Sequence, residues 1–393
     1  MKNNRTFLEK LLDGTEVEWK PLWSVTTLDK RFNAVEKEKQ PKVIKYHYYL
    51  ASELKPLIVD GGNVKLLTTN ESDIWTTEEL VQSNISEGEI IAIPWGGNPI
   101  VQYYKGKFVT ADNRIATSNN TKILDNKFLY YFLLSKLDVI SSFYRGSGIK
   151  HPSMYHVLEM LIPIPPLPVQ TEIVRILDAL TALTSELTSE LTLRRKQYEY
   201  YREKLLSEEE LEKVGFEWKT LDQISENLDS KRKPITSGLR TSGKIPYYGA
   251  SGIVDYVKDY IFDGNFLLIS EDGANLLARN TPIAFSASGK IWVNNHAHIL
   301  KFETYEERRF IEFYLNKIDL TPYISGAAQP KLNKKNLNSI KFPIPSIPEQ
   351  QRIVSILDKF EALTNSITEG LPLSIEQSQK RYEYYRELLL DFS

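Results

Sequence analysis

Residues 163–206 read PIPPLPVQTEIVRILDALTALTSELTSELTLRRKQYEYYREKLL, and this stretch decides the fold. A proline-rich start is followed by a stripe of residues at alternating spacings of four and three. The stripe consists of Ile173, Leu177, Leu180, Thr184, Leu187, Leu191, Arg194, Tyr198, Tyr201 and Leu205. Such heptad spacing keeps one face of a helix toward a partner helix. The stretch therefore predicts one long helix that packs against another.

Residues 343–390 supply the partner helix, because they repeat this text as PIPSIPEQQRIVSILDKFEALTNSITEGLPLSIEQSQKRYEYYRELLL. The segment Ile176–Asp178 recurs as Ile356–Asp358, and Tyr198–Glu203 recurs as Tyr382–Glu387. The offset grows by four positions between these matches, so the second copy has additional residues near Gly370–Pro372. Since Gly and Pro both disfavour a helix interior, we expect the second helix to break or kink there.

The repeat starts partway through its own text. Two further matches pair Glu9–Leu12 with Glu203–Leu206 and Glu18–Lys20 with Glu217–Lys219. The chain thus reads as a circularly permuted dimer within one polypeptide. We expect Trp19 and Trp218, at the centres of the second match, to be buried anchors where strands begin.

Two globular regions, residues 23–162 and 220–342, lie between the helical segments. In the first, short β-rich runs such as Glu89–Pro94 are separated by Gly and Asn turns, and Phe128–Leu137 has helical spacing. The second repeats this order weakly. The predicted fold is α/β (α+β), with two tandem globular domains separated by long antiparallel coiled-coil helices in a pseudo-twofold arrangement. The predicted parts are residues 1–162, 163–213, 214–342 and 343–393.

The composition fits a globular protein of more than one domain. The chain has 393 residues, a net charge of −2 and no cysteine, so disulfides, thiolate metal sites and cysteine nucleophiles are excluded. No apolar run has the length of a membrane span, and MKNNRTFLEKLLDG does not read as a signal peptide. We expect a cytoplasmic protein without a membrane partner. Its weak charge argues against a protein that simply coats nucleic acid.

Catalytic motifs are absent from the sequence. It contains neither a phosphate loop ending in Lys-Ser/Thr nor a helical His-Glu-x-x-His motif. Asp13 with Glu18 and Lys20 superficially fits a nuclease pattern, but the repeat copy has no matching aspartate. His296 and His298 could present two imidazoles on one strand face. We favour a polar strand edge or a DNA-facing surface over a metal site, because no third ligand can be named.

Basic and polar residues gather in loops rich in Gly, Ser and Pro. In a DNA-binding protein, such Lys and Arg side chains fix phosphates while amides and hydroxyls read base edges. The alternative for each cluster alone is an ordinary solvated loop. The candidate DNA-binding residues are Arg145, Ser147, Lys150, Lys231, Arg232, Lys233, Tyr247, Ser251, Gln329, Lys331, Lys334 and Lys335.

The whole chain resembles the specificity subunit of type I restriction–modification systems, in particular the IC-like branch. The resemblance is carried by residues 170–206, 349–372 and 7–22, and more loosely by phrases such as PYYGASGIVDYV (246–257). It implies a non-catalytic subunit with two target-recognition domains, each of which reads one half of a bipartite, asymmetric target in double-stranded DNA.

The resemblance also implies the partners. Two modification subunits would bind S-adenosylmethionine and methylate adenines, and two restriction subunits would use ATP and Mg; this chain would bind no cofactor and no metal itself. Candidate interhelix and partner-docking residues are Ile173, Leu177, Leu180, Leu187, Leu191, Tyr198, Tyr201, Ile353, Leu357, Phe360, Tyr382 and Tyr385. Two alternatives stay open: an enzyme with degenerate nuclease or methyltransferase motifs, and a coiled-coil scaffold that binds only proteins.

Overall fold

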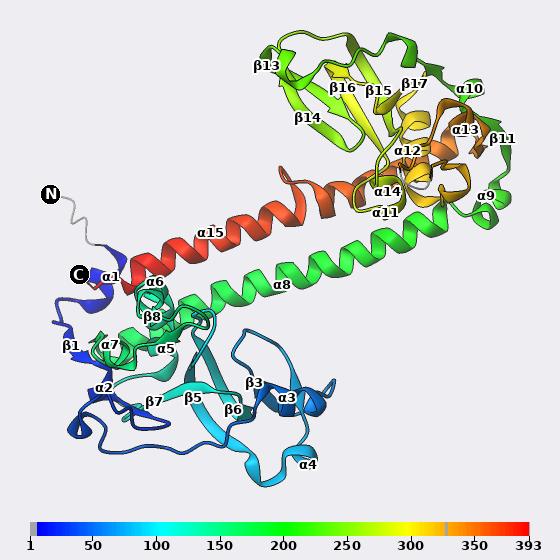
Figure 1. The fold of residues 1–393 in the computed structure, drawn as a ribbon. Coiled ribbons are helices and arrows are strands. Elements are labelled where there is room, and N and C mark those ends of the chain that lie inside the picture. The colour runs from blue at the N-terminus through cyan, green and yellow to red at the C-terminus, as the bar shows by residue number, and fades with distance from the viewer. Residues whose placement is uncertain (1–5, 327–328, 393) are drawn as a thin grey trace. The chain divides into compact units, whose positions relative to one another are not determined.

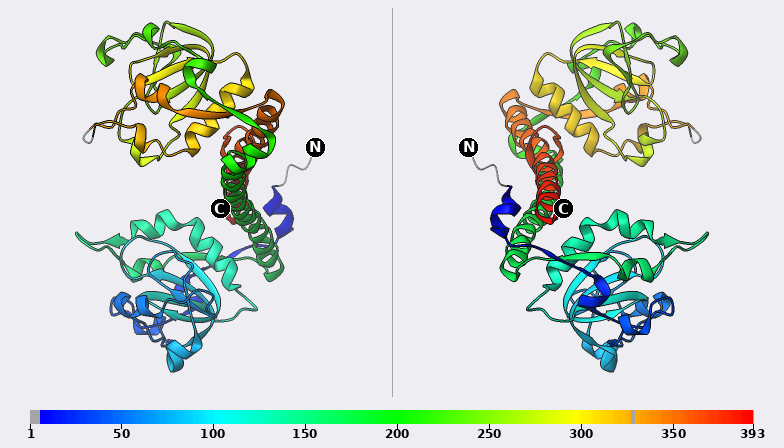
Figure 2. Two further views of the ribbon diagram at one scale, coloured as in Figure 1. Left: turned by 90° about the vertical axis from the view of Figure 1, so that its right-hand side faces the viewer. Right: turned by 90° about the vertical axis from the view of Figure 1, so that its left-hand side faces the viewer.

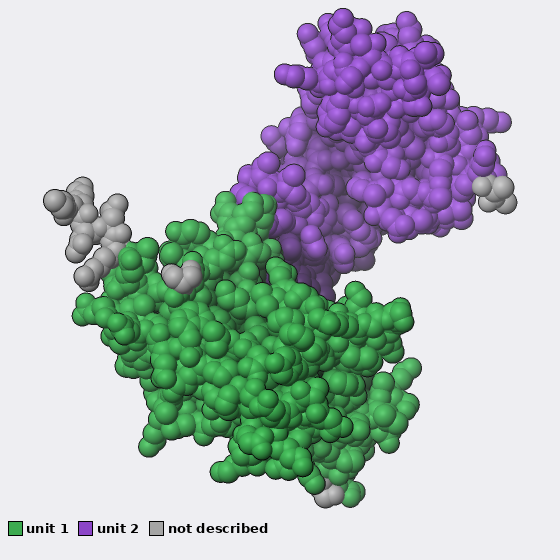
Figure 3. Space-filling view, turned by 60° about the vertical axis from the view of Figure 1, so that its left-hand side comes forward, with its two compact units in different colours: residues 1–186, 375–393 green, residues 187–374 purple. Residues whose placement is uncertain are grey.

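The computed structural model describes residues 6–326 and 329–392. They belong to two compact units, one made of residues 1–186 and 375–393 (unit 1) and the other of residues 187–374 (unit 2; Figure 3). The boundary between the units falls after residue 186, inside the long helix Leu167–Leu205, and after residue 374, near the start of the last helix, Gly370–Leu390. The four predicted parts instead separate the globular regions from the helical ones. Each unit therefore combines one globular domain with portions of the helices.

Unit 1 is built on a six-stranded sheet (Figure 1). All neighbouring strands are antiparallel except one parallel pair, which joins Val64–Leu67 to the long strand beside it. In spatial order the strands are β2 (Thr26–Leu28), β7 (Asn113–Ser118), β5 (Ser86–Pro94), β6 (Gln102–Thr110), β3 (Val64–Leu67) and β4 (Trp75–Thr76). The predicted run Glu89–Pro94 lies in the buried half of β5.

Unit 2 has the same sheet. Its order is β12 (Glu226–Asn227), β17 (Ala297–Lys301), β15 (Phe262–Ser270), β16 (Ala284–Val293), β13 (Ser242–Gly249) and β14 (Gly252–Val257). The parallel pair, β13 with β16, also falls at the equivalent place. Even the opposed glycines correspond, since Gly88 faces Gly106 in unit 1 and Gly264 faces Gly289 in unit 2. The predicted weak repeat is thus a complete structural repeat.

One helix covers each sheet. In unit 1 it is α5 (Asn126–Ser135), whose start is capped by Asp125, and in unit 2 it is α12 (Tyr305–Lys317), capped by Thr304. Phe128 and Phe310 occupy equivalent buried positions on these helices. The shorter helices are α2 (Leu22–Val25), α3 (Ala51–Leu54), α4 (Glu78–Val81), α6 (Leu137–Ser142), α7 (Met154–Leu158), α10 (Leu221–Ile224), α11 (Asn275–Ala278) and α13 (Lys334–Ser339).

A two-stranded ribbon begins each domain: β1 (Glu18–Pro21) pairs with β10 (Leu161–Ile164), and β11 (Phe216–Thr220) pairs with β18 (Lys341–Pro345). Trp19 lies opposite Pro163 and Trp218 opposite Pro343. The expectation that these tryptophans are buried was wrong, since they are 41% and 46% exposed. A ribbon of only two strands leaves part of each indole uncovered. The neighbouring Glu18 and Lys20 pair with each other at 3.0 Å, so this motif forms a surface ion pair.

The long helices are α8 (Leu167–Leu205), α14 (Ile347–Asn365) and α15 (Gly370–Leu390; Figures 1 and 2). The predicted break is confirmed, because residues 366–369 are not helical. Gly370 has φ +76°, and a Cβ there would lie 2.5 Å from the carbonyl oxygen of Ala362. Pro372 lies in the first turn of α15, where its missing N–H costs little. Among the described residues, no helix is both long and apolar enough to cross a bilayer.

In unit 1 the heptad stripe of α8 faces the C-terminal part of α15. Ile173 and Leu177 are fully buried in one cluster with Leu389 and Leu390. Further along, the hydroxyls of Thr184 and Ser378 lie 2.9 Å apart. Later residues of α8 therefore meet earlier residues of α15, so the pair is antiparallel, as predicted. Leu180, Tyr382 and Tyr385 are half-buried.

In unit 2 the remainder of the stripe faces α14. The ring of Tyr201 stacks on Phe360 with centroids 5.5 Å apart, and Tyr198 lies tilted beside the same ring. Arg195 donates to the carbonyl oxygen of Thr364 at 3.4 Å, so this pair is antiparallel as well. Ile353 and Leu357 are fully buried, whereas Leu187 and Leu191 are half-buried.

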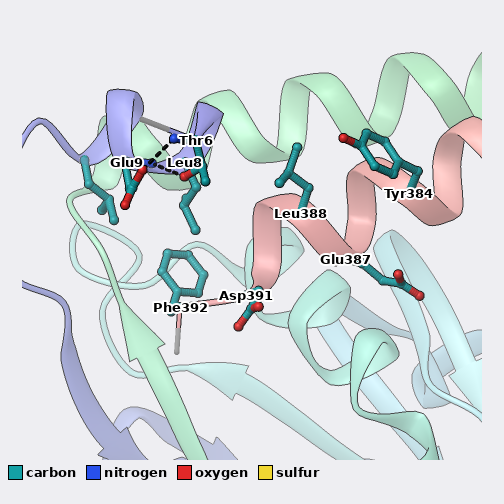
Figure 4. A pocket seen from close by; sticks show the side chains of 9 residues that line it. Thr6, Leu8, Glu9, Tyr384, Glu387, Leu388, Asp391 and Phe392 are labelled. Atoms are coloured by element: carbon teal, nitrogen blue, oxygen red, sulfur yellow. Dashed lines mark hydrogen bonds between the residues drawn. The ribbon is translucent and has the colours of Figure 1, made fainter. Parts of the chain in front are cut away.

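Described residues near both termini, in α1 (Phe7–Leu12) and at the end of α15, pack together in unit 1 (Figure 4). Helix α1 begins with a capping box, in which Glu9 accepts from the Thr6 amide and Thr6 accepts from the Glu9 amide. Its Leu8 joins the cluster of Leu389 and Leu390 beside a hollow of about 440 Å³. In unit 2, Leu211 of α9 (Glu208–Val214) packs with Leu206 in the same way. The circular permutation holds, but helix α1 corresponds to α9, which shares its Leu-Glu-Lys sequence. The match of Glu9–Leu12 with Glu203–Leu206 was therefore wrong, since the end of α8 corresponds to the end of α15.

Candidate nucleic-acid interface

Each unit contains an aspartate, with a side chain only 12% or 8% exposed, that ties the loop after the edge strand β2 or β12 to the sheet. In unit 1, Asp29 follows β2 and accepts a hydrogen bond from the amide of Ile115 at 3.0 Å. In unit 2, Asp229 follows β12 and accepts from the amide of Ile299 at 2.9 Å. The aspartates and their donors correspond in the two sheets, so they form one shared frame.

A basic side chain lies beside each aspartate. In unit 1, Nη1 of Arg114 is 3.8 Å from the Asp29 carboxylate, and the guanidinium stacks 4.2 Å above the Trp95 ring. In unit 2, Nδ1 of His298 is 2.6 Å from Oδ2 of Asp229. Both basic side chains are buried, with 2% and 1% of their surface exposed. Each carboxylate therefore has a basic partner inside the protein.

A hairpin extends from this frame in unit 1. It is formed by β8 (Tyr144–Arg145) and β9 (His151–Pro152). Gly97 donates its amide to Lys150 at 3.1 Å, and Nδ1 of His151 lies 2.6 Å from the Trp95 carbonyl oxygen. At Gly96 a Cβ would lie 2.9 Å from the Ile149 side chain, so a larger residue there would force this side chain to shift. These bonds hold the base of the hairpin, while the side chains of residues 145–150 at its tip are exposed.

The equivalent segment of unit 2 is held mainly by backbone bonds. The amides and carbonyls of Ser325 and Lys331 pair at 2.8 and 2.9 Å, and the Gly273 amide donates to Pro330 at 3.1 Å. The Leu332 amide donates to the Glu271 carbonyl at 2.8 Å. Gly273 and Pro330 thus correspond to Gly97 and Lys150, and the two hairpin segments leave the frame at the same place.

Charged side chains converge on this frame in unit 2. Arg232 donates to the Glu271 carboxylate at 2.6 Å, and Nζ of Lys331 lies 3.2 Å from the other oxygen of Glu271. Burial alone would raise the pKa of Glu271, but the hydrogen bond from Arg232 and the positive charges nearby lower it. The pKa of Asp229 is lowered against the effect of burial by its hydrogen bond to His298. In unit 1, by contrast, burial dominates and raises the pKa of Asp29.

The structure brings together motifs that are separate in the sequence. Arg232, Lys331 and His298, one from each of three separate motifs, meet around Glu271 and Asp229. The histidines do not converge on each other: His296 faces Asp272 at 2.9 Å, and His298 faces Asp229. Within the described ranges, no group of three or more His, Asp or Glu side chains could hold a metal ion.

Two of the predicted DNA-binding residues point inward, and the prediction is corrected for them. Arg232 is only 13% exposed, because its guanidinium neutralises Glu271 and donates to the Ala297 carbonyl. Tyr247 is 1% exposed, and its hydroxyl accepts from the Ile235 amide at 2.9 Å. Neither side chain is available at the surface for a phosphate or a base.

The other predicted DNA-binding residues are exposed. In unit 1 they lie on the hairpin, and in unit 2 they surround the charged frame or lie on the β13–β14 turn. They are Arg145, Ser147, Lys150, Lys231, Lys233, Ser251, Gln329, Lys331, Lys334 and Lys335. The frame itself was not predicted from the sequence. One sequence feature could have indicated it: a Leu-Asp pair follows each Glu-Trp-Lys motif at a similar distance, as Leu28–Asp29 and as Leu228–Asp229.

Comparison with known proteins agrees with this duplicated architecture. The family model described as the type I restriction modification DNA specificity domain matches residues 23–193 and 213–377. A putative type I restriction enzyme specificity subunit of Haemophilus influenzae is 40% identical, with both chains covered completely. The EcoR124I/EcoR124II specificity subunit of Escherichia coli is 34% identical over 98% of this chain and 97% of that protein.

The fold is also found in a solved structure. The crystal structure of the type I restriction–modification S subunit from M. genitalium superposes with a TM-score of 0.62 and 20% identity, covering 96% of each chain. The duplicated sheet, the paired long helices and these matches lead to one conclusion: the chain belongs to the family of type I restriction–modification DNA specificity proteins.

Proposed function

We propose that the chain gives a type I restriction–modification complex its sequence specificity, and that each unit reads one half of a bipartite, asymmetric DNA target. One observation carries this proposal. The two units share their sheet order and their aspartate-centred frame, whereas the exposed hairpin segments differ in sequence. Two domains that share one sheet and one set of aspartate contacts, but differ in their exposed hairpin residues, are suited to recognise two different half-sites.

The exposed side chains have the chemistry for this task. Lys231, Lys233 and Lys331 in unit 2 can contact phosphates, which sets orientation and affinity but not sequence. Ser147 in unit 1 and Gln329 in unit 2 offer hydrogen-bonding groups for base edges. Positive charge from partner subunits would supplement this chain, whose net charge is −2.

We further propose that the chain itself is non-catalytic, binds no cofactor and acts in the cytoplasm. Two modification subunits would bring S-adenosylmethionine, and two restriction subunits would bring ATP and Mg. The long helices expose similar residues in both copies of the repeat. A partner subunit that binds this chain twice could therefore make the same contact at both places. Tyr200 and Tyr384 are 59% and 61% exposed, and each lies against the following tyrosine at an interplanar angle of 75°.

Co-expression with the modification subunits tests this function. The assembled complex is expected to methylate adenines in one bipartite motif, which methylation mapping of a plasmid library identifies. The chain alone and the modification subunits alone are expected to leave the motif unmodified. Methylation or cleavage by the purified chain alone would favour an enzyme with degenerate motifs. Assembly without sequence-specific DNA binding would favour a protein-binding scaffold.

A further inference from the structure

Both ring nitrogens of His298 face oxygen atoms. Nδ1 lies 2.6 Å from Oδ2 of Asp229, and Nε2 lies 2.7 Å from the backbone carbonyl oxygen of Leu332. The ring is 1% exposed, so water does not substitute for either partner. The histidine thus bridges the loop after β12 and the segment that carries Lys331.

These partners fix the protonation of the ring. A backbone carbonyl only accepts, so Nε2 must carry a proton. Oδ1 of Asp229 accepts from the Ile299 amide and Oδ2 from the Asn227 side chain at 3.2 Å, which are the bonds of an ionised carboxylate. Nδ1 must then donate as well. A histidine that donates from both nitrogens is an imidazolium cation.

The equivalent position in unit 1 holds a permanent cation. Arg114 pairs with Ile93 across β5 and β7, as His298 pairs with Ile269 across β15 and β17. Each precedes the isoleucine whose amide binds the frame aspartate. The same place in the repeat therefore requires a positive charge, which arginine supplies at any physiological pH and histidine supplies only while protonated.

We propose that His298 is a positioning residue for DNA recognition: its imidazolium holds the Lys331 segment against the Asp229 loop, at the place in the repeat where unit 1 has the permanent cation Arg114. Recognition of the half-site read by unit 2 then depends on pH, while recognition by unit 1 does not. This inference rests on the proposed division of the target between the units.

The surroundings determine the consequence of deprotonation. The charged groups that face His298 are Asp229, Glu271 at 3.8 Å, and, through these carboxylates, Arg232 and Lys331. Loss of a proton removes the hydrogen bond from His298 to either Asp229 or the Leu332 carbonyl and removes one positive charge beside two carboxylates. Because the proton on His298 supports the Lys331 segment, affinity for the second half-site is expected to fall by up to about tenfold for each pH unit over which the proton is lost.

The test uses the chain assembled with its modification subunits. Affinity is measured from pH 6 to 9 for the cognate DNA and for DNAs with either half-site scrambled, which gives a discrimination factor for each half. Only the factor for the unit 2 half-site is expected to fall with rising pH. In H298R that decline is expected to disappear, and in R114H a decline is expected to arise in the other factor. Equal pH profiles for both halves, or a decline that persists in H298R, would overturn the proposal.

A second measurement does not depend on binding. The chain has five histidines, so ¹⁵N-labelled imidazole spectra of the wild type and H298R identify the ring by difference. Both ring nitrogens of His298 are expected at the shifts of a cation at pH 7, and a neutral tautomer would overturn the proposal. A complex that discriminates neither half-site at any pH would contradict the proposed function instead, and the ring spectrum would then decide the charge of His298 alone.

Discussion

Replacing Arg309 with Met should destabilise unit 2 strongly. This arginine joins α12 to α14, and its side chain is 8% exposed. Its guanidinium lies 2.6 Å from Glu312 and 2.7 Å from Asp358, and it also pairs with Glu361. Methionine fills a similar volume but leaves three carboxylates without their shared cation.

The expected loss is about 3–5 kcal/mol of unfolding free energy, the cost typical of removing one partner from a buried ion pair. The internal repeat supplies a matched control. Lys127 of α5 corresponds to Arg309, but it pairs with the single carboxylate of Asp178 at 2.7 Å and is 32% exposed. K127M should therefore cost only about 0–1 kcal/mol.

The pH dependence has a definite sign. Burial raises the pKa of Glu312, and Arg309 opposes this rise. Because the folded-state pKa exceeds the unfolded value, ionised Glu312 weighs against folding above its folded-state pKa, and this penalty fades as pH falls. Removing Arg309 enlarges the penalty, so the deficit of R309M should shrink toward acidic pH.

Urea unfolding of the full chain, followed by hydrogen exchange of peptides from each sheet, measures both variants. Protection is expected to fall in the β15–β16 peptides for R309M and to change little in the β5–β7 peptides for K127M. Equal losses in the two variants, or an R309M deficit that stays constant from pH 8 to 5, would refute this account of the junction.

Three further predictions follow from the helices and loops. G370A should lose about 1–3 kcal/mol of unfolding free energy in urea titrations, because alanine combines a strained positive φ with a contact at 2.5 Å to a carbonyl oxygen; an unchanged midpoint would contradict this. A third Thr-Ser-Glu-Leu unit after residues 184–191 extends the continuous α8 by about 6 Å and turns it by about 40° net. Methylation mapping should then show a nonspecific spacer longer by one base pair, since a base pair adds about 34–36°, and an unchanged spacer would mean that α8 does not set it. The double variant K231A/K233A should weaken binding to all sequences and flatten the log-affinity against log-salt slope by up to about 0.9 for each phosphate that is no longer neutralised; an unchanged slope would leave both lysines as solvated loop charges.

The helices were predictable because their signals are local and repeated. Heptad spacing identifies the buried face of α8, and the Gly370–Pro372 insertion predicts the break, since backbone sterics at Gly and Pro depend little on tertiary context. The strand order of the sheets was not predictable in the same way. It depends on pairings such as β3 with β6, whose residues are about forty positions apart.

The recognition surface was predicted only in part, because residue type does not determine exposure. Arg232 and Lys233 are neighbours in one basic cluster, yet one neutralises buried Glu271 and the other is exposed. Tyr247 and Ser251 lie in one glycine-containing stretch of the sequence. Tyr247 is buried because it belongs to the buried face of β13, whereas Ser251 is exposed. These differences arise from carboxylates and strands that the sequence places far away.

Exchange of one reading surface tests the central claim most directly. Residues 23–150, which contain the sheet and the exposed tip of the hairpin of unit 1, would be replaced by the corresponding segment of a relative with a different hairpin sequence. Methylated adenines would then be mapped for the complexes assembled with the original and the exchanged chain. If each unit reads one half of the target, one half of the methylated motif changes while the other half stays identical. A change in both halves, with the complex still assembled, would contradict the division of recognition between the two units.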